Sequence, residues 1–181
     1  MPYAKKKLIG VFGGSFDPPH RGHYKIATES IKKLKLNKLY WIVTKKNPFK
    51  KKSLFSIDDR IKKSRLLTKK NRKIYVKFYD KKIKSNKTID ILRYLIKKNT
   101  NNHYFLILGS DNLRNFHKWR DWKKILTISQ LVVFSRKGYI NNYKKSVILK
   151  FLKQKKIIFF KKFKMNISSS NIKKKLKNIE S

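Results

Sequence analysis

Short apolar segments alternate with longer amphipathic segments along the whole chain. The apolar segments have the length of strands, and we expect strands near Leu8–Phe12, Leu39–Val43, Ile74–Phe78, Tyr104–Leu108, Leu131–Ser135 and Ile157–Phe160. Apolar strands separated by amphipathic helices are typical of a parallel sheet that is covered on both faces. We therefore predict an α/β fold, a Rossmann-like doubly wound parallel sheet of about six strands with helices on both faces.

The expected helices lie between these strands. They cover Gly22–Leu34, Ile57–Leu67, Thr88–Lys98, Trp119–Leu126 and Asn142–Leu152, and a last helix begins in Ser168–Ser170 and continues through Lys177. Ser56 is suited to be the N-cap of the second helix, where Asp58 and Asp59 complement the helix dipole. No repeat, proline-rich linker or change of composition divides the sequence, so we expect a single domain over residues 1–181.

The formal net charge of +41 arises from 42 Lys and 8 Arg against 9 acidic residues. Such a charge suggests a polyanionic partner, but codons rich in A and T would also raise Lys, Asn, Ile, Tyr and Phe together. Lysines occur in every segment from Lys5 to Lys177, which favours the compositional explanation. We still expect weak, non-specific binding of nucleic acid through charge at low ionic strength.

The chain contains no cysteine, which excludes disulfides, thiolate zinc sites and a cysteine nucleophile. It also has no apolar run long enough to cross a membrane and no signal-peptide core. We therefore expect a cytoplasmic protein without a membrane partner, and the sequence indicates no oligomeric state.

The candidate chemistry begins where the first strand ends, in the segment from Gly13 to His23. Gly13 and Gly14 allow backbone N–H groups to approach a phosphate, and the N-terminus of the next helix adds partial positive charge. His20 and His23 can both face a bound phosphate chain, since imidazole donates hydrogen bonds and carries charge near neutral pH. Each feature alone has an ordinary structural explanation, but together on one turn they favour a phosphate site.

The run Gly14-Ser15-Phe16-Asp17-Pro18-Pro19-His20-Arg21-Gly22-His23 resembles the signature of the nicotinate-nucleotide adenylyltransferases, in the nucleotidyltransferase superfamily with a His-x-Gly-His motif. Near the other end, Ile167-Ser168-Ser169-Ser170-Asn171-Ile172-Lys173 is similar to the family's Ile-Ser-Ser-Thr-x-Ile-Arg, which implies hydroxyls and amides that hold the ATP phosphates. Lys173 in place of Arg keeps the charge but lacks the planar fork that grips phosphate with two bonds. Without the resemblance, the serines would be a helix N-cap.

Between these motifs, Gly109-Ser110-Asp111 and Trp119 are similar to a family segment whose Asp lies near the adenosine ribose and whose Trp lies against the pyridine ring. An indole face suits stacking on a flat heteroaromatic ring. Core packing on an amphipathic helix is the alternative for Trp119 and for Trp122.

Further residues match the family less closely. Lys50 follows Pro48 and Phe49, where the family has a loop that touches the mononucleotide, and Lys45 is the other candidate for its phosphate. Thr88 looks like a family threonine near the same substrate. Arg136 resembles an Arg-Pro-Gly turn with Lys137 in place of proline, and it either reaches the adenine or solvates a strand end.

The resemblance implies adenylyl transfer from ATP to nicotinate mononucleotide, with release of pyrophosphate. The implied catalytic residues are His20, His23 and Lys173. The implied ATP-binding residues are Gly13, Gly14, Ser15, Phe16, His20, His23, Gly109, Asp111, Arg136, Ile167, Ser168, Ser169, Ser170 and Lys173, and those for the mononucleotide are Ser15, Phe16, Lys45, Lys50, Thr88 and Trp119. Mg²⁺ is expected to be held mainly by substrate phosphates, without a protein metal site. Asp17, the nearest acidic residue, either caps the turn or fixes Pro18.

Three alternatives remain open. The acceptor could be nicotinamide mononucleotide or phosphopantetheine, although Pro18-Pro19 and the Gly-x-Asp segment favour nicotinate mononucleotide. The chain could instead be a basic nucleic-acid-binding module without catalysis, or a decayed enzyme. The main interpretation requires that the histidine pair and the serine-rich turn meet at one triphosphate.

Overall fold

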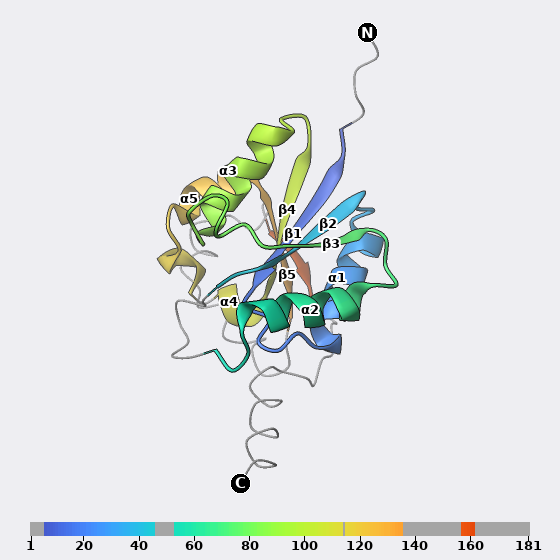
Figure 1. The fold of residues 1–181 in the computed structure, drawn as a ribbon. Coiled ribbons are helices and arrows are strands. Elements are labelled where there is room, and N and C mark those ends of the chain that lie inside the picture. The colour runs from blue at the N-terminus through green and yellow to red at the C-terminus, as the bar shows by residue number, and fades with distance from the viewer. Residues whose placement is uncertain (1–5, 46–52, 114, 136–156, 162–181) are drawn as a thin grey trace.

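The computed structural model describes residues 6–45, 53–113, 115–135 and 157–161. Within them the strands β1 (Leu8–Gly14), β2 (Lys38–Val43), β3 (Ile74–Lys77), β4 (His103–Gly109), β5 (Gln130–Phe134) and β6 (Ile157–Phe160) form one sheet. All neighbouring pairs are parallel, and the order is β3-β2-β1-β4-β5-β6 (Figure 1). The predicted fold class is confirmed, and the order of the strands reverses between β1 and β4.

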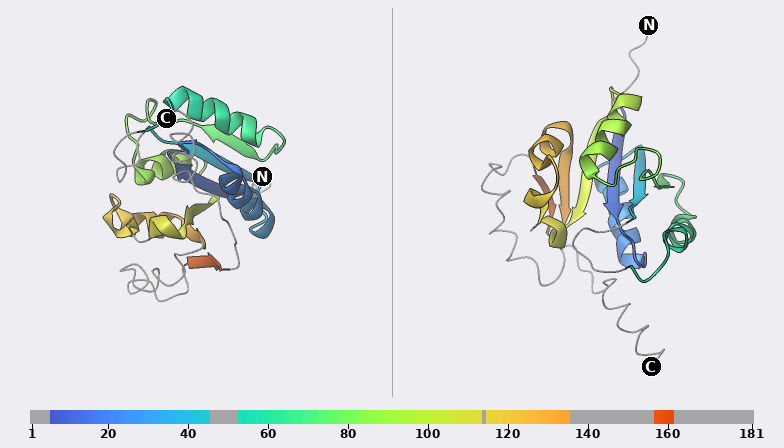
Figure 2. Two further views of the ribbon diagram at one scale, coloured as in Figure 1. Left: turned by 90° about the horizontal axis from the view of Figure 1, so that it is seen from below. Right: turned by 60° about the vertical axis from the view of Figure 1, so that its left-hand side comes forward.

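The helices lie on both faces of this sheet. They are α1 (Arg21–Lys33), α2 (Ile57–Thr68), α3 (Thr88–Lys98), α4 (Ser110–Leu113) and α5 (Trp122–Ile128), with a 3₁₀ turn, η1, over Phe116–Lys118. Figure 2 shows α1 and α2 on one side of the sheet and α3 and α5 on the other. The predicted helices over 142–152 and 168–177 lie outside the described residues.

Two apolar clusters form the core, one on each face of the sheet. Successive residues of a strand point to opposite faces, so Leu106 and Leu108 belong to the cluster under α3 and α5. Phe105 and Ile107 belong to the cluster under α1 and α2. Burial on both faces explains why these strands consist of continuous apolar runs.

Helix α2 begins as predicted. The Ser56 side chain accepts a hydrogen bond from the Asp59 backbone N–H at 3.0 Å, and Asp58 and Asp59 occupy the first turn. This cap satisfies one of the amides that a helix start leaves without an intrahelical partner.

The predicted helix over Trp119–Leu126 is wrong at its start. Trp119 has extended backbone angles (φ −76°, ψ 143°) at the end of η1, and Asp121 is left-handed with φ 52°. The helix α5 therefore begins at Trp122, and the short α4 and η1 fill the connection from β4. The Trp119 ring packs on Phe116 at 5.1 Å between centroids and against the core cluster under α3 and α5, and this packing outweighs the helical period of the segment.

Candidate nucleotide site

The candidate site lies where the strand order reverses. Phe12 of β1 pairs with Ile107 of β4, so Gly14 and Gly109 end these neighbouring strands at the same level. In open parallel sheets ligands bind outside the carboxyl ends of the strands at such a reversal. The predicted segments after β1 and after β4 are therefore brought together, although they are about 95 residues apart.

The two predicted histidines lie against each other at the start of α1. Their rings stack with centroids 3.7 Å apart and planes 27° from parallel. His20 is the N-cap of α1, and its backbone N–H donates to Nδ1 of His23 at 3.3 Å, in a reciprocal capping box. Since Nδ1 accepts this bond, a neutral His23 carries its ring proton on Nε2, which makes that nitrogen a donor.

Two aromatic side chains, Phe16 and Trp41, pack beside the histidine pair. The Phe16 ring stacks on Trp41 with centroids 4.3 Å apart and meets the His23 ring edge-on at 5.0 Å. Phe16 is 3% exposed and Trp41 is fully buried. The Phe16 ring therefore belongs to the core, so Phe16 can offer a ligand its backbone but not its ring. The role of Trp41 was not predicted, because a buried Trp in an apolar strand looks like ordinary core sequence.

The two glycines at the end of β1 differ in their surroundings. A Cβ added at Gly13 would meet no atom of the described residues within 4 Å, and Gly13 is exposed. A Cβ at Gly14 would lie 3.2 Å from the Phe16 ring. Gly13 thus leaves open backbone at the strand end, as approach by a phosphate requires, whereas Gly14 makes room for an aromatic ring.

Asp17 has a structural role. It is 2% exposed, and its carboxylate accepts hydrogen bonds from the backbone N–H groups of Leu54 and Phe55, each at 2.9 Å. The sequence suggested that Asp17 caps its own turn or fixes Pro18, whereas these two amides belong to the segment before α2. Asp17 thereby ties the loop after β1 to the start of α2.

Two charged residues near this loop were missed by the sequence reading. Arg60 of α2 is 2% exposed and donates hydrogen bonds to backbone carbonyls of both neighbouring loops, and Asp80 accepts a hydrogen bond from the Lys45 backbone N–H at 2.7 Å. Burial raises the pKa of Asp80, and this is partly offset by the Lys45 amide and by Arg60. Burial lowers the pKa of Arg60, while Asp17 and Asp80 act in the opposite direction. The rarity of arginine in this lysine-rich chain was the one available signal for Arg60.

The structure places the remaining described candidates as follows. Gly109 is buried at the end of β4, and Asp111 follows it, half-buried, in α4. Lys45 is exposed just after β2, and Thr88 is half-buried at the start of α3. Trp119 is half-buried and packs against the core cluster under α3 and α5, so core packing accounts for at least part of its surface.

The other candidates lie outside the described residues. They are Lys50, Arg136, Ile167, Ser168, Ser169, Ser170 and Lys173. Among the residues that the structure does describe, no three His, Cys, Asp or Glu side chains are grouped so that they could hold a metal ion. Helices long and apolar enough to cross a membrane are likewise not found in this part of the chain.

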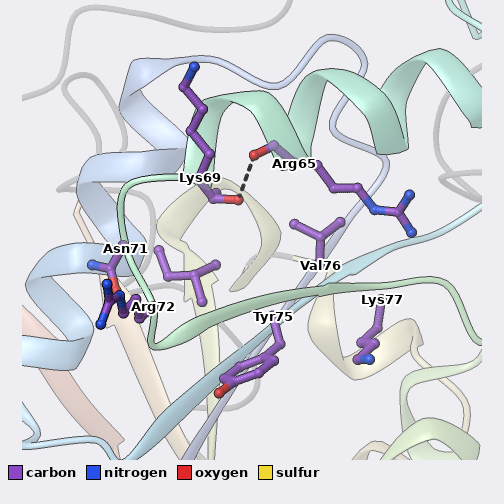
Figure 3. Close-up of a pocket in the computed structure, with 9 residues that line it drawn as sticks. Arg65, Lys69, Asn71, Arg72, Tyr75, Val76 and Lys77 are labelled. Atoms are coloured by element: carbon purple, nitrogen blue, oxygen red, sulfur yellow. Dashed lines mark hydrogen bonds between the residues drawn. The ribbon is translucent and has the colours of Figure 1, made fainter.

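A basic groove lies away from the histidine pair, between the C-terminal part of α2 and the edge strand β3 (Figure 3). Its volume is about 310 Å³. Arg65 and Lys69 extend from α2, and Arg72 and Lys77 come from β3 and the turn before it. Tyr75 also lines the groove, but its 38% exposed ring points away from α2, to the face of the sheet where Tyr40 lies (Figure 3). We call these residues, with Thr68, Asn71, Ile74 and Val76, the basic groove.

Comparison with known proteins shows the family of this chain. The model of the cytidylyltransferase-like family matches residues 11–175. A Pelagibacter ubique protein named "Probable nicotinate-nucleotide adenylyltransferase" is 45% identical over 170 residues, which is 94% of this chain and 94% of that protein. A protein of the same name from Agrobacterium fabrum is 35% identical over 83% of this chain and 80% of its own length. The chain belongs to the cytidylyltransferase-like family, among its nicotinate-nucleotide adenylyltransferases.

Solved structures show the same fold. A Plasmodium falciparum nicotinic acid mononucleotide adenylyltransferase, solved with NaAD, has a TM-score of 0.73 at 19% identity, covering 93% of this chain and 83% of its own. A second solved structure is that of a Vibrio parahaemolyticus protein named "Putative Nicotinate-nucleotide Adenylyltransferase". Its TM-score is 0.67 at 17% identity, covering 95% of this chain and 88% of its own. The doubly wound sheet of this nicotinate-nucleotide adenylyltransferase family member is thus found in proteins that share few of its residues.

Proposed function

We propose that this chain transfers the adenylyl group of ATP to nicotinate mononucleotide, producing nicotinate adenine dinucleotide and pyrophosphate. The stacked His20 and His23 at the start of α1, beside the strand-order reversal, carry this proposal. The names of the sequence relatives support the choice of acceptor over nicotinamide mononucleotide or phosphopantetheine. We further propose that residues 1–181 form one nucleotidyltransferase domain that acts in the cytoplasm.

In the proposed reaction an oxygen of the mononucleotide phosphate attacks the α-phosphorus of ATP. The new P–O bond forms as the bond to the β-phosphate oxygen breaks, and the electron pair leaves with pyrophosphate. Catalysis of this kind depends on positioning and on neutralising charge rather than on a side-chain nucleophile. The Nε2–H of His23 and the His20 ring stacked on it are proposed to stabilise the negative charge that develops at the α-phosphate.

The ATP phosphates are proposed to lie over the open backbone at Gly13, with Gly14 and Ser15 beside it. Asp111 follows the neighbouring strand end and is proposed to approach the ribose. Arg136, Ser168–Ser170 with Ile167, and Lys173 are proposed to complete the site. In support, β6 ends at the same edge of the sheet as β1 and β4, and the chain leaves the described part there, at Lys161.

The mononucleotide is proposed to lie near the end of β2. Lys45 is the second residue beyond β2 and Lys50 follows in the same segment of the sequence, so both are candidates for its phosphate. The backbone of Ser15 and Phe16, the Thr88 hydroxyl at the start of α3 and the half-exposed Trp119 ring are the further proposed contacts.

Mg²⁺ is proposed to arrive bound to ATP. The Asp17 carboxylate is occupied by two backbone amides and is not arranged to bind a metal ion. A Mg²⁺ ion that keeps water and phosphate oxygens as ligands needs few protein carboxylates, and it would supply charge neutralisation of the phosphates.

An assay of pyrophosphate release with ATP, Mg²⁺ and each of the three acceptors tests the proposal. We expect turnover with nicotinate mononucleotide, and a loss of roughly 10³-fold or more in the double variant His20→Ala, His23→Ala, because both donors near the α-phosphate are removed. The variant must keep the wild-type circular dichroism spectrum. Near-normal transfer by a folded double variant would show that the histidines are not catalytic, and turnover with another acceptor alone would reassign the substrate.

A second, weaker binding activity is favoured by the basic groove. Four of its lining residues are cationic and none is acidic. We propose that polyanions such as nucleic acid bind there without sequence preference, through release of counterions.

A further inference from the structure

We propose that Arg60 is a positioning residue that sets the distance between the phosphate-binding turn and the mononucleotide-binding end of β2. This inference rests on the proposed function. Arg60 lies in α2, and the proposed mechanism gives it no role in the chemical step.

The guanidinium of Arg60 joins two loops that are far apart in the sequence. Nη1 donates to the carbonyl of Ser15 at 2.8 Å and to the carbonyl of Thr44 at 2.9 Å. Nη2 donates to the carbonyl of Lys45 at 3.0 Å. One buried side chain therefore holds both the turn after β1 and the first two residues after β2, where the proposed mononucleotide loop begins.

The same guanidinium is fixed on its own helix. Nε of Arg60 donates to the carbonyl of Ser56 at 3.2 Å, and Ser56 caps α2. Because the guanidinium is planar, these bonds define its orientation as well as its place. An ammonium group at this position could keep the charge, but it could not reach three carbonyls with the same geometry.

Two carboxylates complete the arrangement, which we call the Arg60 clasp (Asp17, Arg60 and Asp80 with their backbone partners). Asp17 binds the amides of Leu54 and Phe55, and Asp80 binds the amide of Lys45. Both acidic groups interact favourably with the Arg60 charge, which compensates part of its desolvation. The backbone of Lys45 is thus held on both sides of its Cα, through its carbonyl by Arg60 and through its N–H by Asp80.

The two loops do not depend on Arg60 equally. The turn after β1 is also anchored by the Phe16 ring on Trp41 and by the Asp17 carboxylate. The pair Thr44–Lys45 is held by Asp80 and by a hydrogen bond from the Thr44 N–H to the Gly14 carbonyl, and it also receives two of the three bonds that Arg60 makes to these loops, whereas Ser15 receives one. Loss of Arg60 should therefore displace the mononucleotide side of the site more than the ATP side.

The test is steady-state kinetics of pyrophosphate release by wild type, Arg60→Lys and Asp80→Ala, varying one substrate while the other saturates. For Arg60→Lys we expect the KM for nicotinate mononucleotide to rise about tenfold or more, while the KM for ATP changes less than about threefold. Asp80→Ala removes one hydrogen bond at a partly exposed position, so it should show the same split with a smaller rise.

The matched control is Ile61→Ala, which truncates the next residue of α2, where it packs against the core cluster under α1 and α2. It should lower the melting temperature without changing the ratio of the two KM values. A general loss of stability would move all three variants alike, so the split separates positioning from a merely structural role.

Each outcome decides the matter. If folded Arg60→Lys and Asp80→Ala keep both KM values, or raise the two equally, the role of Arg60 is wrong although the enzyme is active. If Arg60→Lys does not fold, Asp80→Ala alone decides. If wild type releases no pyrophosphate with nicotinate mononucleotide, the proposed function itself fails, and the assignment of Arg60 to that acceptor fails with it.

Discussion

Gly13 and Gly14 are adjacent residues at the end of β1, but a side chain would have different effects at the two positions. Gly14 lies under the Phe16 ring, so a side chain there would disturb the aromatic group that supports His23. Gly13 faces open space within the described structure. A requirement for glycine at Gly13 would therefore come from a ligand rather than from the fold.

We expect Gly13→Ala to leave the free energy of unfolding within about 0.5 kcal/mol of wild type. It should nevertheless reduce kcat/KM for ATP about tenfold or more, because the added methyl would stand where a phosphate approaches the backbone. Thermal unfolding and pyrophosphate release measure the two effects.

Gly14→Ala is the contrasting variant and should lower the melting temperature, since its Cβ would lie 3.2 Å from the Phe16 ring. If Gly13→Ala is fully active, the phosphate chain does not pass over this residue.

Helix α2 is the element that connects the fold to the site. Its N-cap, Ser56, lies between the amides held by Asp17 and the guanidinium of Arg60. A change at this cap therefore acts on the helix first and on the loops of the site second.

Ser56→Ala should cost about 1 kcal/mol of unfolding free energy, as is usual when an N-cap hydroxyl is lost. Urea unfolding followed by circular dichroism would measure it, with the exposed Ser53→Ala as a control of the same chemistry that should cost less than about 0.5 kcal/mol. Equal effects of the two substitutions would argue against the cap.

At the scale of the whole molecule, the net charge of +41 attracts phosphate-bearing molecules of every kind. Lysines scattered over all segments give this attraction no preferred face. The basic groove is distinguished by two of the chain's 8 arginines, Arg65 and Arg72.

We expect binding to single-stranded DNA to weaken steeply with salt. In the double variant Arg65→Gln, Arg72→Gln, the slope of log K against log salt should become shallower by about 1 to 2, as the loss of one or two phosphate contacts requires. Fluorescence anisotropy over a salt series measures the slope.

Lys123→Gln, Lys124→Gln, on α5, removes the same charge elsewhere and should change the slope less. Pyrophosphate release should be unaffected by either pair. Identical slopes for the two double variants would show that the groove has no special role and that charge alone causes the binding.

The elements of the fold followed from local signals in the sequence. The predicted helix Thr88–Lys98 and strand Ile157–Phe160 have the bounds that the structure shows, and the Ser56 cap is where the sequence placed it. Period, apolar run length and capping residues act over a few neighbouring positions, so they can be read without knowing the tertiary structure. The histidine pair could be recognised for the same reason, because His20 and His23 share one helical turn.

Tertiary structure alone decided how distant segments meet. Arg60 binds the carbonyls of Lys45 and Ser15, which precede it by 15 and 45 positions in the sequence. Phe16 stacks on Trp41, which belongs to the next strand. The start of α5 also moved to Trp122, since Trp119 packs against the core cluster under α3 and α5 instead of continuing a helix. Such contacts depend on which strands lie side by side, and a short-range pattern carries no information about that order. The sequence by itself therefore determined most helices and strands and the histidine pair of the site. The pairing of β1 with both β2 and β4 decided which other segments lie around that pair.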